Sequence, residues 1–178
     1  MHKQDTAIIK AILAGDQDQF AILIERYENM VFSLSLKLLK DRSEAEEVAQ
    51  LSFIKAYESL KKYDGNAKFN TWLYRITYNT CLDRIRVLQR QQGNSIADTQ
   101  PEQEQPIRLE QLEKKNAISA AIAELSELDQ WIVILYYYEE KNMKEISHIL
   151  DQSVANVKVR LHRSRKQLKN LLHNNAAI

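Results

Sequence analysis

Apolar residues recur at three- and four-residue steps along most of this 178-residue chain, and that spacing gives an α-helix one buried face. The longest stripe runs over residues 16–39, so we expect that helix to lie at the centre of a bundle. Shorter stripes of the same kind predict further helices over residues 4–14, 45–63, 68–90, 113–125, 127–141, 143–150 and 154–172. The pattern therefore predicts an all-α fold.

Polar residues at the start of these stripes predict where the helices begin. Asp5 or Thr6 is suited to cap the first helix, and Ser126 is suited to cap the helix over 127–141. Ser43 has Glu46 three residues after it, which is the spacing of a capping box. These residues set the expected helix boundaries.

The helix predicted over residues 45–63 has an apolar stripe that we expect to be buried, formed by Val48, Leu51, Phe53, Ile54, Tyr57 and Leu60. Its first two turns gather the polar residues Glu44, Glu46, Glu47 and Gln50. Acidic groups there either balance the helix dipole or form a surface for a partner, and the pattern alone leaves both interpretations open.

Residues 93–111 have no apolar periodicity. They contain both prolines of the chain, together with Gly, Asn, Ser and repeated Gln and Glu. This composition is typical of a flexible acidic linker. We therefore predict two small helical domains, a helical bundle over 1–92 and a four-helix domain over 112–178, joined by that linker.

Charge and cysteine content narrow the function classes. The 25 Lys and Arg nearly balance the 24 Asp and Glu, so any contact with nucleic acid must come from local patches. Cys81 is the single cysteine, which excludes an internal disulfide, and its apolar neighbours predict a buried thiol. No apolar run reaches membrane-spanning length and no signal-peptide core is present, so we expect a cytoplasmic protein without membrane insertion.

One basic patch lies at the C-terminal end. The helices over 143–150 and 154–172 flank the three residues Asp151, Gln152 and Ser153, which fits a helix-turn-helix. Asp151 stands where such turns often use glycine, and Asp tolerates the left-handed conformation. The second helix has six cations and no acid, namely Lys158, Arg160, Arg163, Arg165, Lys166 and Lys169.

A second patch lies on the helix over residues 68–90. Its polar face has Arg75, Asn79, Arg84, Arg86 and Arg90, with Asp83 as the only acid. A polar loop with Gly65 precedes it, ends in the potential cap Asn70–Thr71, and lies beside Phe69, Trp72 and Tyr74. This arrangement is expected of a site that stacks an unpaired base and holds its backbone, although aromatic residues at helical spacing are more often core.

These patterns leave two rival classes. A free-standing helix-turn-helix regulator would also bind duplex DNA through the C-terminal domain, and its N-terminal bundle would act as a sensor or dimeriser. An enzyme is the weaker rival, because the four histidines are scattered and no phosphate loop, metal-ligand spacing or nucleophile constellation occurs. We therefore predict no catalytic residue, no metal and no cofactor.

Four blocks of the chain resemble the extracytoplasmic-function sigma factors of bacterial RNA polymerase, which are part of the sigma-70 family. The blocks are FAILIERYENMVFSLSLKLLKD, AEEVAQLSFIKAYESL, FNTWLYRITYNTCLDRIR and LSELDQWIVILYYYEEKNMKEISHILDQSVANVKVRLHRSRKQL. The resemblance implies a promoter-specificity subunit that binds the beta and beta-prime subunits of the polymerase core and directs initiation at a specific set of promoters. It also implies promoter DNA and an anti-sigma factor as partners.

The resemblance further implies functional residues in both domains. In the first domain, called region two, the core-binding residues are Glu46, Glu47 and Gln50. The same domain captures a flipped base of the minus-ten element through Lys68, Phe69, Asn70, Thr71 and Trp72, followed on the helix by Arg75, Asn79, Asp83, Arg84 and Arg86. In the second domain, called region four, the minus-thirty-five element contacts Ala155, Asn156, Lys158, Val159, Arg160, Arg163 and Arg165. Three residues depart from the family pattern: Leu51 replaces an acid, Asn156 a threonine and Val159 a serine.

Overall fold

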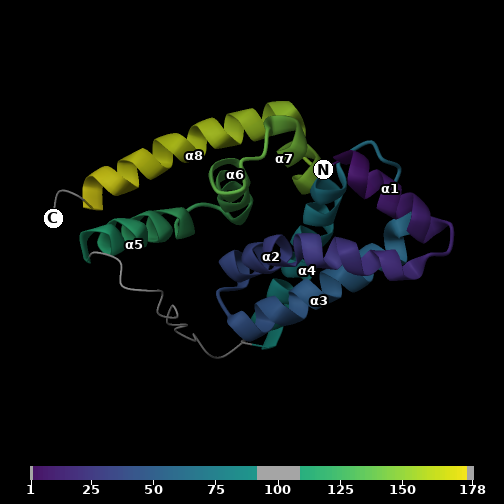
Figure 1. The fold of residues 1–178 in the computed structure, drawn as a ribbon. Helices are drawn as coiled ribbons and strands as arrows, with labels where there is room; N and C mark the ends of the chain where they lie inside the picture. Colours follow the sequence, from purple (N-terminus) through teal and green to yellow (C-terminus); the bar gives the residue numbers. More distant parts are fainter. Residues whose placement is uncertain (1, 92–108, 176–178) are drawn as a thin grey trace. The chain divides into compact units, whose positions relative to one another are not determined.

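The structure, a computed structural model, describes residues 2–91 and 109–175, and every regular element in those ranges is a helix (Figure 1). The helices fall in two compact units, the first with α1–α4 and the second with α5–α8. The predicted all-α fold with two helical domains is confirmed. Most of the predicted linker lies outside the described residues, and α5 begins at Leu109, inside the predicted linker range.

In the first unit, α2, α3 and α4 pack against one another, and α1 packs on α2. Its elements are α1 (His2–Leu13), η1 (Gln17–Gln19), α2 (Phe20–Leu39), α3 (Arg42–Ser59), η2 (Leu60–Lys62) and α4 (Phe69–Gln91). All the main helices supply fully or nearly fully buried side chains to the core, among them Ile9, Leu23, Val31, Phe53 and Leu73. The long stripe over residues 16–39 therefore lies at the centre of the unit, as predicted.

Asp5 does not cap the first helix. The helix already begins at His2, and Asp5 is only 3% exposed. Its carboxylate accepts hydrogen bonds from Arg26 Nη1 and, at 2.7 Å, from Tyr27 Oη, both on α2. Burial, followed by the bond to Asp5, raises the pKa of Tyr27. Asp5 is therefore a buried polar link between α1 and α2.

The capping box predicted at Ser43 and Glu46 is wrong. Lys40 ends α2 in the left-handed conformation, with φ 54°, and Asp41 then takes an extended conformation. The Asp41 carboxylate accepts from the Glu44 N–H at 2.8 Å, so Asp41 caps α3. The residue that follows a left-handed helix end is free to become the next cap, and this shifts the start of α3 to Arg42.

Cys81 lies on α4 with no exposed surface, and its thiol donates to Ser35 Oγ on α2 over 3.8 Å. Burial raises the pKa of the Cys81 thiol to about 11. The reactive thiolate is therefore about a hundredfold rarer near neutral pH than in an ordinary thiol.

We expect Cys81 to react with a thiol reagent at least about a hundredfold more slowly in the folded protein than in denaturant at pH 8. The rate should rise with pH towards the raised pKa, because only the deprotonated sulfur attacks. Absorbance at the release of the reagent's chromophore measures both rates. Equal rates in buffer and denaturant would show that the thiol is accessible.

The second unit consists of α5 (Leu109–Ala123), α6 (Glu127–Tyr137), α7 (Met143–Leu150) and α8 (Val154–Asn175). Helix α8 packs against the other three. The predicted Ser126 cap is confirmed, because its hydroxyl accepts from the Asp129 N–H. A capping box that the sequence analysis missed opens α7, with Asn142 and Glu145 as its two residues. Within the described ranges, no helix has the length and apolar character needed to cross a membrane.

Candidate nucleic-acid interface

Helices α7 and α8 form the predicted helix-turn-helix. Asp151 adopts the left-handed conformation, with φ 54° and ψ 45°, as the turn requires. The Ser147 hydroxyl donates to the Gln152 carbonyl, and the Gln152 N–H donates back to the Ser147 carbonyl at 3.0 Å. Ser153 then caps α8 by accepting from the Asn156 N–H at 3.1 Å. These bonds set the direction in which α8 leaves the turn.

Apolar packing holds the two helices together. On α7 the side chains of Ile146 and Leu150 are buried, and on α8 those of Val157 and Leu161 are buried. The opposite face of α8 is therefore left in solvent. It presents Ala155, Lys158, Val159 and Arg163, which are all exposed and recur at helical spacing. Those four of the seven predicted minus-thirty-five residues lie together on an accessible face.

The other three predicted residues of α8 make contacts within the unit. Asn156 donates to Gln152 Oε1 at 2.7 Å. Arg160 Nη1 donates to Asp129 Oδ1 on α6 at 3.0 Å, and its buried Nε has no hydrogen-bond partner within the described chain. Arg165 lies over Tyr136 and donates to the Tyr137 hydroxyl at 2.7 Å. The last two guanidinium groups thus both connect α8 to α6.

In the first unit, the polar loop before α4 is closed by its own hydrogen bonds. The Tyr63 hydroxyl donates to the Ala67 carbonyl at 2.7 Å, and Asp64 Oδ1 accepts from the Asn66 N–H at 3.0 Å. Gly65 has φ 75°, a conformation that favours glycine. The Lys68 carbonyl accepts from the Trp72 N–H, so α4 begins directly after Lys68, and the Asn70–Thr71 pair is not its cap.

Aromatic side chains cluster where this loop meets α4. The Tyr63 and Trp72 ring centroids are 5.2 Å apart, and Phe69 lies 5.6 Å from Trp72. Phe69 and Tyr74 are core residues, with 0% and 1% of their surface exposed. Trp72 and Tyr63 are half-buried and are the aromatic surface beside the loop.

The other predicted loop residues also differ in exposure. Lys68 is exposed, Asn70 is half-buried and Thr71 is buried. The sequence pattern does not single out Tyr63, because it stands at the end of the apolar stripe predicted over residues 45–63. The loop hydrogen bond of its hydroxyl has no sequence signal, since it depends on how the chain turns back after η2.

The polar face of α4 is linked by ion pairs to α3. Arg84 Nη2 donates to Glu44 at 2.8 Å and to Glu47 at 3.0 Å. Asp83 lies 3.6 Å from Lys55 Nζ and 3.3 Å from Arg86 Nη1. The structure thereby brings a predicted core-binding residue, Glu47, into direct contact with a predicted minus-ten residue.

Asn79 and Arg75 complete the predicted residues of α4. Asn79 is exposed, and Arg75 is half-buried.

The predicted core-binding residues Glu46, Glu47 and Gln50 are all exposed on α3. Beside them lies an apolar surface that we call the α3 apolar patch, formed by Leu51, Ile54 and Tyr57, which are 39%, 54% and 38% exposed. The prediction that these three residues are buried is wrong.

Small residues explain the error. Ala45, Ser52 and Ala56 are fully buried on α3, and the larger Val48 and Phe53 are buried beside them. Short side chains permit close packing of the neighbouring helices, so the buried face is turned away from the strongest apolar stripe. The sequence stripe therefore identified a helix correctly but placed part of its apolar surface on the wrong side.

Comparison with known proteins places the chain in a family. Sigma-70 region 2 matches residues 23–91, and Sigma-70, region 4 matches residues 115–168. The ECF RNA polymerase sigma factor SigW of Bacillus subtilis is 33% identical, covering 92% of this chain and 94% of that protein. SigM of the same organism is 32% identical, covering 84% of this chain and 92% of that protein.

Solved structures show the same fold at lower sequence identity. CnrH, solved in complex with the cytosolic domain of CnrY, has a TM-score of 0.70 and 21% identity, covering 94% of this chain and 96% of that chain. The sigma factor RpoE of Bartonella quintana, solved with the anti-sigma factor NepR, has a TM-score of 0.67 and 20% identity, covering 86% and 96% of the two chains.

A helical two-unit protein with both sigma-70 regions in order is a sigma factor, and this chain belongs to the sigma-70 family. Within that family it belongs to the extracytoplasmic-function group. It is a promoter-specificity subunit, which binds the bacterial RNA polymerase core and directs transcription initiation at a specific set of promoters.

Proposed function

We propose that the two units divide this work. The first, over residues 1–92, binds the polymerase core and the minus-ten element, and the second, over 112–178, binds the minus-thirty-five element. The observation that supports this division most strongly is the exposed face of α8 directly after the helix-turn-helix turn, with Lys158 and Arg163 on it. A helix presented in this way fits the major groove, where a guanidinium contacts guanine through two hydrogen bonds.

The core-binding surface in this proposal combines charge with apolar area. Glu47 lies four residues before Leu51 and Gln50 lies four residues before Ile54, so each pair is about one turn apart on the exposed side of α3. An apolar patch bordered by polar residues is a common form of protein interface. Leu51, at the position where the family has an acid, therefore extends the apolar patch rather than the buried core.

The minus-ten site in this proposal lies where the loop meets α4. An unpaired base would stack on Trp72 or Tyr63, while Lys68 and Asn70 supply polar contacts beside the rings. Stacking on an aromatic side chain is worth about 1–3 kcal/mol per base, which offsets part of the cost of removing that base from the duplex. Phe69 and Thr71 are both buried, so they would hold the site in position through packing and would not contact the base.

On α8, we expect Arg163→Ala to weaken binding to the minus-thirty-five element about 10- to 100-fold, without a loss of folding stability, because its side chain is exposed. Arg160→Ala should instead lower stability, because it leaves Asp129 without its partner on α8. DNA affinity of the holoenzyme measures the first effect, and hydrogen exchange in α6 and α8 measures the second. Similar losses of stability in both variants would contradict this division of roles.

The proposal includes no catalytic step, because sigma factors act as regulatory subunits of the polymerase. It places the protein in the cytoplasm, where it meets the polymerase and promoter DNA. It also includes an anti-sigma partner. RpoE of the same fold is solved with the anti-sigma factor NepR, and a partner of that kind would compete for surfaces needed by the polymerase.

Run-off transcription tests the function. Core polymerase would be incubated with a pool of genomic promoter fragments, with and without this protein. We expect selective new transcripts only when both proteins are present, and their start sites would identify the two promoter elements. Tight binding to duplex DNA without polymerase, and no new transcripts, would instead favour a free-standing regulator.

A further inference from the structure

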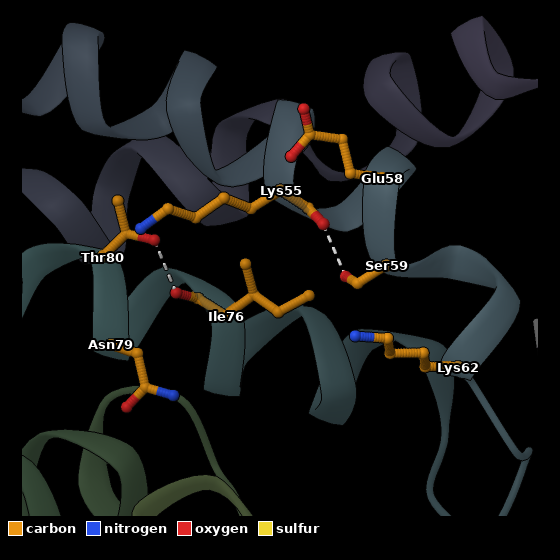
Figure 2. Close-up of a pocket in the computed structure, with 7 residues that line it drawn as sticks. All are labelled: Lys55, Glu58, Ser59, Lys62, Ile76, Asn79 and Thr80. Carbon is orange, nitrogen blue, oxygen red and sulfur yellow. Dashed lines mark hydrogen bonds between the residues drawn. The ribbon is translucent and has the colours of Figure 1, made fainter.

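An open cleft of about 390 Å³ lies beside the predicted minus-ten helix, and among the residues that line it Asn79 alone belongs to the predicted minus-ten site. Figure 2 shows Lys55, Ser59 and Lys62, from α3 and η2, on one side of the cleft, and Ile76, Asn79 and Thr80 of α4 on the other. Its volume falls within the range of about 300–1,000 Å³ that is usual for ligand sites. The cleft is therefore large enough for part of a nucleotide.

The hydrogen bonds within the cleft determine which ligand it suits. The Ser59 and Thr80 hydroxyls donate to the carbonyls of Lys55 and Ile76, at 2.5 Å and 2.9 Å, so their protons are already used (Figure 2). Lys62 and Asn79 are exposed, and neither side chain makes a hydrogen bond or ion pair with another described residue. The donors that remain for a ligand are an ammonium group and an amide, which suit an anion.

Two other charges border the cleft. Lys55 forms an ion pair with Asp83, whose carboxylate lies 3.6 Å from the Lys55 ammonium nitrogen. The charge of Lys55 is therefore already partly neutralised. Glu58 also lines the cleft and would repel an anion. Lys62 is therefore the cation best placed to hold a phosphate, and Glu58 limits the affinity.

The position of the cleft along α4 indicates the source of that phosphate. Asn79 is seven residues after Trp72, which corresponds to about 10 Å of helix. A stacked strand advances about 3.4 Å per nucleotide, so this distance spans on the order of three nucleotides. A strand whose unpaired base is held at Trp72 can thus place a nearby phosphate in the cleft.

We propose that the cleft between α3, η2 and α4 binds a backbone phosphate of the melted promoter strand, with Lys62 and the Asn79 amide as donors. The inference rests on the proposed minus-ten function of the first unit and adds Lys62 to it. Contacts to phosphate contribute affinity and register and do not distinguish bases. Lys62 therefore strengthens binding to all promoters of this factor about equally.

The test uses holoenzyme made with the full chain and a promoter fragment identified by run-off transcription, with its minus-ten region already unpaired. We expect Lys62→Ala to weaken binding about three- to tenfold and to reduce the log–log salt slope by about 0.7, the value for one phosphate contact on a single strand. Lys61→Ala is the matched control, because Lys61 is exposed next to Lys62 but does not line the cleft. Glu58→Gln should strengthen binding about two- to threefold by removing a repulsion.

A second measurement locates the phosphate. Single neutral methylphosphonates are placed in turn along the unpaired strand, and one position should weaken the wild-type complex but leave the Lys62→Ala complex unchanged. Equal effects of Lys62→Ala and Lys61→Ala would overturn the proposal, as would a Lys62→Ala defect in binding to core polymerase with an unchanged DNA salt slope. In either case the wild-type protein would still direct transcription. A wild-type protein that directs no transcription would refute the proposed function itself and this proposal with it.

Discussion

Replacing Ile54 by aspartate lowers the affinity of the protein for core polymerase about 10- to 100-fold and leaves its fold intact. Ile54 is 54% exposed at the centre of the α3 apolar patch, so its loss removes little packing from the protein itself. In the complex, the new carboxylate would be buried against an apolar surface without a partner. Truncating an interface residue of this kind costs about 2 kcal/mol or more, and a tenfold change corresponds to 1.4 kcal/mol.

Fluorescence anisotropy of labelled protein titrated with core polymerase measures this affinity. The matched control is Ile22→Asp, the same substitution at an exposed isoleucine on α2, with 39% of its surface exposed. It should leave core binding within about twofold of the wild-type value. Thermal unfolding of both variants checks that the fold is retained. Equal affinities of Ile54→Asp and wild type would remove the α3 apolar patch from the core interface.

Replacing Asp5 by alanine destabilises the first unit by about 2–4 kcal/mol. The substitution leaves Arg26 without its carboxylate partner and removes the acceptor for the buried Tyr27 hydroxyl. Removing one partner of a buried ion pair costs about 3–5 kcal/mol, and the cost is lower here because 26% of the Arg26 side chain is exposed. Since α1 is held to α2 by this link, its release should loosen α1 first.

Hydrogen exchange is the suitable measurement, because two units need not unfold together and one melting curve would mix them. Asp5→Ala should speed exchange in α1 and α2 by about 30-fold or more and leave α6 unchanged. Asp5→Asn keeps an acceptor for Tyr27 but loses the charge. Its exchange rates in α1 and α2 should lie between those of Asp5→Ala and the wild type. Asp18→Ala replaces an exposed acid in η1 and is the control. Unchanged exchange in α1 for Asp5→Ala would show that the link contributes little stability.

The charged residues of α4 illustrate why a site on a helix is only partly predictable. Spacing along the sequence placed Arg75, Asn79 and Arg84 on a polar face. Asn79 is exposed at the cleft, but Arg84 is held by Glu44 and Glu47 of α3. Those partners are about forty residues away in sequence, so their contact depends on helix packing. Exposure and pairing decide which groups can meet DNA, and neither is a local property.

Local patterns were sufficient for the helix-turn-helix, since a three-residue break, a left-handed Asp151 and apolar residues on both sides are all properties of a short segment. Helical periodicity likewise determined the all-α class, because a stripe of apolar residues specifies a helix whatever it packs against.

By contrast, only the tertiary structure decided that Asp5 is a buried link, that Phe69 and Tyr74 are core residues, and that Leu51 and Ile54 are exposed. The physical reason is that a sequence states which side chains share a helix face. The neighbouring helices decide which face is buried, and small residues such as Ala45 and Ala56 can turn that face away from the most apolar one.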